Sequence, residues 1–123
     1  MSGVIKMKKF GKNEIDENIR SGLVELLILQ LLSEEDMYGY RIRRELAKRT
    51  GEVFLMKEGS LYGPLYRLHE RNFISSHREL VGEKRFRNYY HIEPSGLEYL
   101  EYGKAECERV FDGVKSLFHY TEK

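Results

Sequence analysis

The chain has 123 residues, of which 41% are hydrophobic and 33% charged, and its formal net charge is +1. This length suits one small domain with a single core and leaves little room for an enclosed substrate pocket. The apolar content excludes a disordered chain, and the longest apolar run, residues 23–32, is about half the length of a membrane span. We therefore expect a globular protein that does not cross a membrane.

The N-terminal residues and the cysteine content bear on the cellular compartment and on possible metal sites. Residues 1–12 are basic but lack the continuous apolar centre and small-residue cleavage site of a secretory signal. Cys107 is the only cysteine, so neither an intramolecular disulfide nor a thiolate zinc site can form. We expect a cytoplasmic protein without a cofactor.

Charge is distributed unevenly along the chain. Residues 1–92 hold 17 basic and 13 acidic side chains, whereas residues 93–123 hold 4 basic and 7 acidic ones. Affinity for DNA comes largely from Lys and Arg that displace counterions from phosphates, and only the contacting face must be basic. The division suits a basic DNA-facing part and a separate acidic helix; a solvated surface of mixed charge is the alternative.

The first two segments are a tail and a buried helix. Residues 1–19 mix Lys and Glu with glycine and asparagine and show no sustained periodicity, which predicts a basic, mobile N-terminal arm. Residues 23–32 are apolar almost all round a helix, which predicts burial on most sides. This first helix is expected to anchor the core.

A second helix is predicted after the polar residues 33–36, which offer capping oxygens. Ile42 and Leu46 lie four apart on its inner face, and Gly51 closes it. Other side chains of this helix face outward and are candidate contacts to DNA phosphates. They are Tyr38, Tyr40, Arg41 and Arg44.

A third helix is predicted to start near Gly59. At about 100° per residue, Leu61, Leu65 and Leu68 form a narrow apolar stripe that packs on the first two helices. Pro64 is tolerated only near the first turn, which independently indicates the same start. In a helix-turn-helix the opposite face of this element enters the major groove of DNA. The candidate contacts on it are Ser60, Tyr62, Gly63, Tyr66 and Arg67.

Tyr62 can equally be a core aromatic whose hydroxyl reaches the rim, and Arg67 can be a solvated charge rather than a DNA contact. Glycine at position 63 removes a side chain where the backbone would approach DNA closely.

Two strands, residues 73–80 and 85–92, are predicted to form a hairpin with its turn at Gly82. Their side chains alternate, which places Phe86 and Tyr90 on a core face and the intervening residues on an exposed face. Cations cluster at and beside the tip, where such a wing can follow phosphates or enter the minor groove. They are Lys84, Arg85 and Arg87.

The hairpin also holds two histidines, His77 and His91, that can be neighbours across the strands. A zinc site would need further nitrogen, sulfur or carboxylate ligands at metal spacing. Ordinary sheet residues are the better interpretation, and we expect no metal site.

A final helix is predicted over residues 95–119, with apolar residues in a heptad pattern that Lys104 interrupts. A helix of about 25 residues spans about 37 Å, so its far end is expected to bury its apolar side on another subunit. In a twofold dimer the two third helices would meet half-sites about 34 Å apart, which predicts a pseudo-palindromic operator. The predicted dimer seam contains Leu97, Leu100, Cys107, Val110, Phe111, Val114, Leu117 and Phe118.

Several motifs stand in a specific order: the apolar run 23–32, Tyr-Gly-Tyr-Arg-Ile at 38–42, Gly-Ser-Leu-Tyr at 59–62, and Tyr-Tyr-His-Ile at 89–92 followed by Gly96. Together they resemble the PadR family of bacterial and archaeal transcriptional regulators. The resemblance implies a mainly α fold with a small β-hairpin: a winged helix-turn-helix over residues 20–93 and a C-terminal dimerisation helix over residues 94–123. It also implies a repressor released by a small-molecule effector, and the single short final helix is similar to that of the compact subfamily.

Two functions remain open from the residues themselves. One is a homodimeric regulator that binds double-stranded DNA sequence-specifically, and the other is a winged-helix module that docks protein partners. Cations on the third helix and the wing favour DNA. An enzyme is the weakest hypothesis, because no nucleophile elbow, phosphate-binding glycine loop, zinc pattern or paired-carboxylate motif occurs in the sequence.

Overall fold

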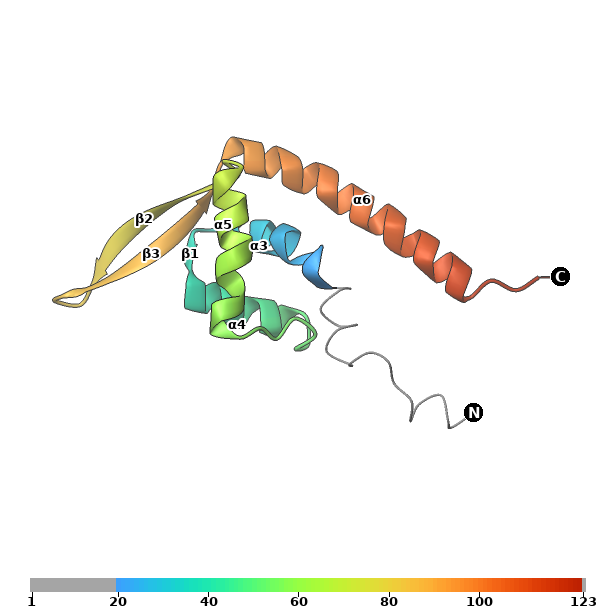
Figure 1. Cartoon of the computed structure of the whole chain (residues 1–123), viewed down its shortest axis with the longest axis horizontal. Helices are drawn as coiled ribbons and strands as arrows, with labels where there is room; N and C mark the ends of the chain where they lie inside the picture. The colour runs from blue at the N-terminus through green and yellow to red at the C-terminus, as the bar shows by residue number, and fades with distance from the viewer. Residues whose placement is uncertain (1–19, 123) are drawn as a thin grey trace.

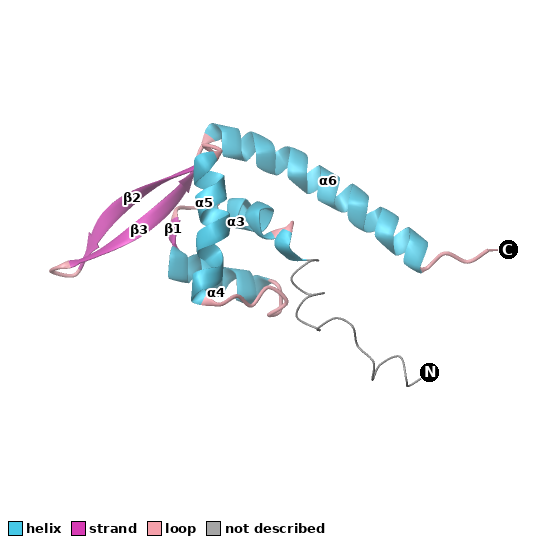
Figure 2. Cartoon of the chain, in the orientation of Figure 1, coloured by secondary structure: helices cyan, strands magenta, loops and turns pink. Residues whose placement is uncertain are grey.

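The computed structural model describes residues 20–122; the arm expected over residues 1–19 lies outside the described residues. Figure 1 shows a helical body, with a hairpin projecting from one side and a long helix from the other. Figure 2 shows how much of this chain is helical. The elements are α3 Val24–Leu32, β1 Met37–Tyr38, α4 Gly39–Arg49, the 3-10 helix η1 Glu58–Leu61, α5 Tyr62–Glu70, β2 Ile74–Val81, β3 Arg85–Ile92 and α6 Pro94–Phe118.

The core forms where α3 meets α4, α5, the sheet and the first turns of α6. Ile28 and Leu29 of α3, Ile42 of α4 and Leu68 of α5 have no exposed surface. Burial of one such side chain is worth about 1.5–3 kcal/mol relative to exposure. Apolar contact with α3 therefore holds the two helices of the helix-turn-helix in place, as the apolar run predicted.

The third helix begins as predicted but in two stages. The 3-10 turn η1 covers the expected start near Gly59, and α5 follows from Tyr62 with Pro64 in its first turn. Asn72, just after α5, has a φ of 62°, the left-handed conformation that commonly ends a helix. Proline and asparagine thus set the two ends of this short helix.

The sheet has three antiparallel strands in the order β1-β3-β2. The hairpin agrees with the predicted one, and its turn residue Gly82 has a φ of 76°. β1 was missed, because Tyr38 was assigned to the start of the second helix. A strand of two residues is too short to show a period of two, so only its pairing with β3 reveals it.

One assignment within the hairpin was wrong. Side chains at alternate positions share a face, and near the base Ile74 and Ile92 of that face are buried. Phe86, predicted to be in the core, lies on the same face but is 55% exposed near the tip. Alternation indicates which face a residue occupies but not how far the helices extend along it.

α6 packs on the body through its first ten residues. A Cβ added at Gly103 would lie 2.4 Å from Leu26 Cδ2, so the glycine permits close packing of α6 on α3. Leu100 is 2% exposed within the protomer, which corrects its assignment to the dimer seam. The heptad pattern runs from the part of α6 that packs on the body to the part predicted to form the dimer seam. Periodicity alone therefore cannot show where the first contact ends and the second begins.

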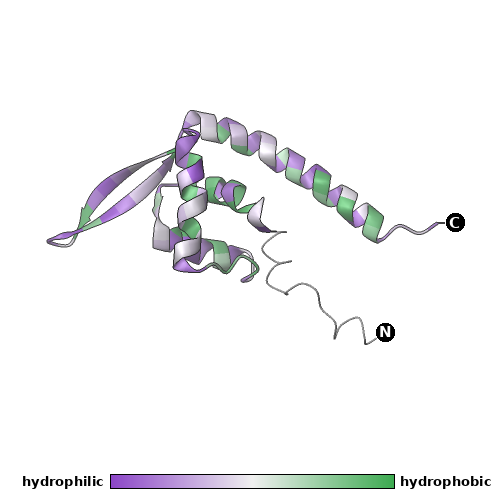
Figure 3. Cartoon of the chain, in the orientation of Figure 1, coloured by the Kyte–Doolittle hydropathy of each residue, from purple (hydrophilic) through white to green (hydrophobic). Residues whose placement is uncertain are grey.

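Beyond Gly103 the apolar side of α6 has no cover among the described residues. Figure 3 shows hydrophobic segments along the C-terminal half of this helix, away from the body. The exposed apolar side chains there are Val110, Phe111, Val114, Leu117 and Phe118. Within residues 20–122, no helix combines the length and apolar character that crossing a bilayer would require.

Candidate nucleic-acid interface

The outward face of α5 is formed by residues opposite its buried stripe. Leu65 and Leu68 point into the core, and at about 100° per residue Gly63 and Tyr66 lie on the other side. Tyr66 is 65% exposed, and Gly63 presents only backbone. This face can approach a flat or concave partner closely, with one aromatic side chain standing out from it.

Tyr62 flanks this face on the side of the sheet. It is 62% exposed, which excludes the interpretation as a core aromatic. Burial, together with the nearby Tyr62, raises the pKa of Tyr90 above its ordinary value of 10.0.

Arg67 flanks the opposite side of α5 and turns toward α3. Its Nε lies 2.7 Å from Glu25 Oε2 in an ion pair. A Cβ added at Gly63 would lie 3.3 Å from Arg67 Nη1, so the missing side chain makes room for the guanidinium. Sequence reasoning did not select Glu25 as part of the site. The feature that could have indicated it is that Glu25 is the one carboxylate in the apolar run 23–32.

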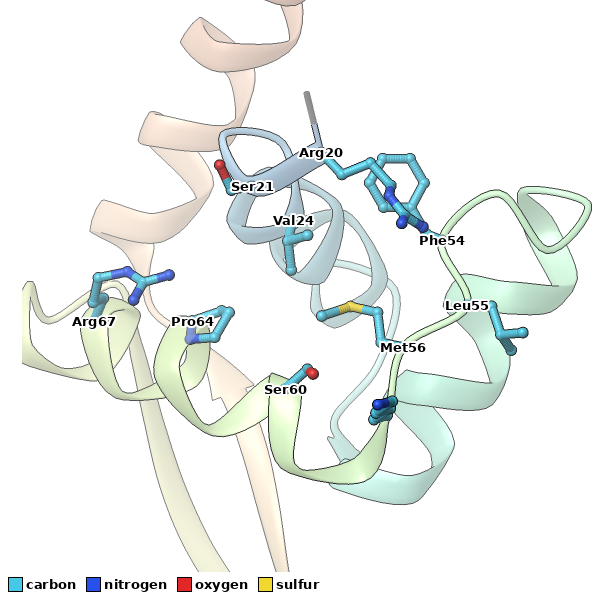
Figure 4. A pocket seen from close by; sticks show the side chains of 10 residues that line it. Arg20, Ser21, Val24, Phe54, Leu55, Met56, Ser60, Pro64 and Arg67 are labelled. Carbon is cyan, nitrogen blue, oxygen red and sulfur yellow. The ribbon is translucent and has the colours of Figure 1, made fainter. Parts of the chain in front are cut away.

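A hollow of about 580 Å³ lies between the start of α3, residues 54–57 and the start of α5 (Figure 4). Val24, Phe54 and Pro64 are buried and provide apolar lining. Figure 4 shows Arg20 and Arg67 approaching it from opposite sides. The hollow thus combines apolar and cationic groups beside a candidate DNA contact.

The start of α4 is joined to the hairpin by an aromatic cluster. Tyr38 stacks with Tyr40 at 6.5 Å between ring centroids and meets Tyr89 edge-on at 5.4 Å. The Arg87 guanidinium carbon lies 4.2 Å from the Tyr38 ring centroid, and that of Arg44 lies 6.0 Å from the Tyr40 ring. Predicted residues from two elements far apart in sequence are therefore brought together.

Arg43 joins this cluster although sequence reasoning did not select it. Its guanidinium carbon lies 5.5 Å from the Tyr40 ring centroid. Arg41, which was selected, instead forms an ion pair with Glu35 in the preceding loop. Helical spacing alone could not distinguish these neighbouring arginines, because the difference depends on the position of Glu35.

The remaining predicted cations lie at the hairpin tip. Lys84 and Arg85 are exposed, and neither has an ion-pair partner in the part of the chain that the structure describes. Ser60 is also exposed, at the junction of η1 and α5. These groups are available to an anionic partner.

The two hairpin histidines are not directly opposite each other. His77 pairs in register with Tyr89, and His91 pairs with Ser75. His77 Nε2 lies 2.8 Å from Glu79 Oε2. Across residues 20–122, no three His, Cys, Asp or Glu side chains are grouped closely enough to hold a metal ion.

His91 ties the hairpin to the loop before β1. Its Nδ1 lies 2.8 Å from Asp36 Oδ1, and this hydrogen bond raises the pKa of His91 above its ordinary 6.5. The folded-state pKa is thus above the unfolded one, so the contribution to stability is complete below about pH 6.5 and is lost as pH rises through the folded pKa.

We therefore predict that His91→Gln lowers the thermal midpoint at about pH 5 and leaves it unchanged at about pH 9. The loss is expected to stay below about 1 kcal/mol, because both groups are partly exposed and solvent weakens their attraction. Thermal melts of the two proteins at both pH values measure it. Asp36→Asn is expected to remove the same pH dependence; a deficit of equal size at both pH values would contradict the ion pair.

The sequence matches a family of regulators and is similar to a bacterial protein. The sequence pattern of the transcriptional regulator PadR-like family matches residues 28–102 of this chain. Uncharacterized protein X of Lysinibacillus sphaericus is 35% identical over 101 residues, which cover 80% of this chain and 93% of that protein.

The fold is similar to solved structures of the same class. A PadR-like transcriptional regulator from Bacillus cereus is 31% identical, with a TM-score of 0.73 over 85% of this chain and 99% of that one. Bacillus subtilis PadR, solved in complex with operator DNA, is 25% identical, with a TM-score of 0.59. That match covers 64% of this chain and 45% of the longer PadR chain.

Proposed function

This chain belongs to the PadR-like family of transcriptional regulators, and from that membership we propose that it is a homodimeric repressor that binds a pseudo-palindromic operator. Relatives in the family are transcriptional regulators and not enzymes. A repressor acts on the chromosome, so we place it in the cytoplasm. Residues 20–93 form the proposed DNA-binding domain, and residues 94–123 the proposed dimerisation helix.

The outward face of α5 carries this proposal. Gly63 lets the backbone approach base edges, and Tyr66 and Tyr62 extend toward them, in the arrangement by which a recognition helix occupies a major groove. Operator DNA bound to a PadR of similar fold supports the same partner for this chain. α5 is the proposed reading element, with Ser60 at its start.

The cations around α5 are proposed to contact phosphates. Arg44 and Arg87, joined through the tyrosines at the start of α4, flank one side of the reading helix, and Lys84 and Arg85 extend the contact at the hairpin tip. Such contacts set the orientation of the protein on DNA and contribute most of the salt dependence of binding. Arg67 is proposed to join them when DNA competes with Glu25 for its guanidinium.

Dimerisation is proposed to bury the far half of α6. Its exposed Val110, Phe111 and Val114 recur at helical spacing and continue past the contact with α3. An exposed apolar patch of this kind is typical of an interaction surface. Pairing it with its twofold copy would place two α5 helices on successive half-sites.

The first experiment is fluorescence anisotropy with labelled duplexes from the DNA upstream of the gene, at two salt concentrations and with unrelated competitor DNA. We expect preferential binding that weakens as salt increases. A folded, dimeric protein that shows no preference would contradict sequence-specific regulation. That result would favour the alternative function of docking protein partners.

The same assay tests the phosphate contacts. Arg85→Ala is expected to weaken binding to all duplexes and to lower the slope of log affinity against log salt by about one, because one fewer counterion is displaced. Lys104→Ala, an exposed cation on α6 away from the hairpin, serves as the matched control and is expected to leave the slope unchanged. Equal slopes for Arg85→Ala and the wild type would remove this residue from the interface.

We further propose that a small molecule releases the protein from DNA. The hollow of about 580 Å³ supports this, because a ligand there would touch α3 and α5 together and compete with Glu25 for Arg67. Its apolar lining and nearby arginines suit a small amphipathic anion. Small aromatic and aliphatic carboxylates added to the preformed complex are expected to lower its anisotropy; an unchanged signal throughout the series would contradict release through this hollow.

A further inference from the structure

The long helix α6 leaves the body where the reading helix ends and the hairpin begins (Figure 1). Two hydrogen bonds join these segments. Glu93 N donates to Phe73 O at 2.9 Å, next to the start of α6. Ser95 Oγ, in the first turn of α6, donates to Asn72 O at 2.7 Å. We call this meeting point the α6 junction, and it consists of residues 71–73 and 93–99.

A stack of three side chains fills the α6 junction. The rings of Phe73, just before β2, and Tyr99, on α6, are stacked with their centroids 4.5 Å apart and their planes 21° apart. The guanidinium carbon of Arg71, the residue that ends α5, lies 4.6 Å from the Phe73 centroid and 4.8 Å from the Tyr99 centroid. The ends of α5, the hairpin and α6 are therefore joined by one contact.

The stack lies beside the hydrophobic core and is not part of it. Arg71 is exposed, and Phe73 and Tyr99 are only partly buried against the core residues. A cation over an exposed ring adds little stability, but a planar guanidinium stacks in a defined orientation. The stack is therefore better suited to hold the direction of α6 than to stabilise the fold.

The stack and the exposed apolar strip of α6 lie on opposite sides of one close helix contact. A Cβ at Gly103 would lie 2.4 Å from Leu26 Cδ2, so the backbone of α6 approaches α3 closely there. At about 1.5 Å per residue, Tyr99 lies about 6 Å before this contact and Val114 about 16 Å beyond it. A shift of about 1 Å at Tyr99 thus becomes about 3 Å at Val114, close to the rise of one base pair, about 3.4 Å.

Resting on the proposed function, we propose that the stack of Arg71, Phe73 and Tyr99 sets the half-site spacing that the dimer accepts. The stack holds the direction of α6 relative to α5, and the paired far halves of α6 hold one protomer against the other. The distance between the two reading helices therefore depends on the stack. These three are positioning residues, because they act on DNA selection through that distance and not through contact with bases.

Half-site spacing is a part of sequence selection separate from the base pairs that α5 reads. One added base pair lengthens the separation by about 3.4 Å and turns the second half-site by about 35° round the duplex. A dimer with rigidly held α6 helices loses contacts at one half-site, whereas a dimer whose α6 helices rock recovers them. A rigid junction therefore rejects operators of the wrong spacing.

The test measures anisotropy with full-length protein on the operator duplex from the first experiment and on duplexes whose half-site spacer is shortened or lengthened by one or two base pairs. The wild type is expected to prefer one spacing at least about tenfold over its neighbours. Tyr99→Ala is expected to reduce this preference to about threefold or less, because the missing ring leaves α6 room to rock. A duplex with a single half-site is expected to bind both proteins equally.

Two conservative variants separate positioning from a structural or ionic role. Tyr99→Phe keeps the stacked ring and is expected to keep the wild-type preference. Arg71→Lys keeps the charge but has no planar group to stack, so it is expected to weaken the preference while leaving the salt slope unchanged. Tyr102→Ala, at a 69% exposed ring on the same helix, is the matched control and is expected to bind like the wild type at every spacing.

Three results would overturn the inference. They are a Tyr99→Ala protein with the wild-type preference, an equal loss of affinity at every spacing and on the single half-site, and a control variant that also loses the preference. The second of these is the result that a purely structural role predicts. If melts or sedimentation show that Tyr99→Ala is unfolded or monomeric, Arg71→Lys decides, because that change is at an exposed residue.

The wild type distinguishes this inference from the function on which it rests. If it does not prefer the operator to unrelated DNA, the proposed function fails. If it prefers the operator but binds all spacings alike, only the inference about the α6 junction fails.

Discussion

Val114→Arg is expected to convert the proposed dimer to monomers and to lower operator affinity at least about 100-fold. Val114 is 44% exposed in the protomer and lies in the apolar strip of α6 between Phe111 and Leu117. An arginine buried there against its twofold copy would have no counterion, and breaking the desolvated interface costs several kcal/mol, each 1.4 kcal/mol being tenfold in affinity. A monomer also loses the gain in affinity from engaging two half-sites together.

The protomer itself is expected to stay folded, because Val114 has no part in its core. Sedimentation equilibrium and anisotropy with the operator duplex measure the two effects, and far-UV circular dichroism checks the fold. Asp112→Arg places the same side chain about 160° away round the helix and is expected to leave the dimer intact. A dimeric Val114→Arg protein that binds the operator normally would exclude this strip as the subunit interface.

Gly96→Ala is expected to lower the free energy of unfolding by about 3 kcal/mol, and Gly96→Val by more. A Cβ at this position would lie 2.3 Å from Phe73 O and 2.9 Å from Ile92 Cγ1. The carbonyl of Phe73 cannot move away freely, because it accepts a hydrogen bond from Glu93 N at 2.9 Å. Domains of this kind are stable by only about 5–15 kcal/mol, so the loss is a large share of the total.

The sign of this effect is informative, since alanine in place of an exposed helical glycine usually stabilises by about 0.5–1 kcal/mol. Gly113→Ala is the matched control in the same helix, where a Cβ would meet no described atom within 4 Å, and it is expected to show that gain. Urea unfolding of both variants at one fixed protein concentration measures the difference. A neutral or stabilised Gly96→Ala protein would show that the α6 junction can relax around a methyl group.

Local chemistry in the sequence was sufficient to predict several elements. Pro64 is compatible with a helix only near its start, and apolar side chains at every second position indicated the hairpin, whose predicted turn at Gly82 is confirmed. These predictions succeeded because each depends on the residue itself or on neighbours within a few positions. The short strand β1 was missed because its two residues become a strand only by pairing with β3.

The candidate site was predictable in its elements but not in its individual contacts. Residues of α5, the start of α4 and the hairpin were selected from spacing and charge, whereas the ion pair of Arg67 with Glu25 joins residues 42 positions apart. Arg41 was likewise selected, but its pairing with Glu35 depends on the loop before β1. Charge type is a property of the sequence, but the direction of a long side chain depends on which opposite charge lies near it.

The sequence by itself determined the order of the helices and the two hairpin strands, the buried stripes of α4 and α5 and the cationic character of the hairpin tip. Only the tertiary structure decided where the core ends. Phe86 and Leu100 both belong to apolar patterns, yet one is exposed beyond the body and the other is buried against α3. Periodicity identifies a face of a helix or strand, but burial depends on whether another element lies over that face, and that is a property of the packed chain.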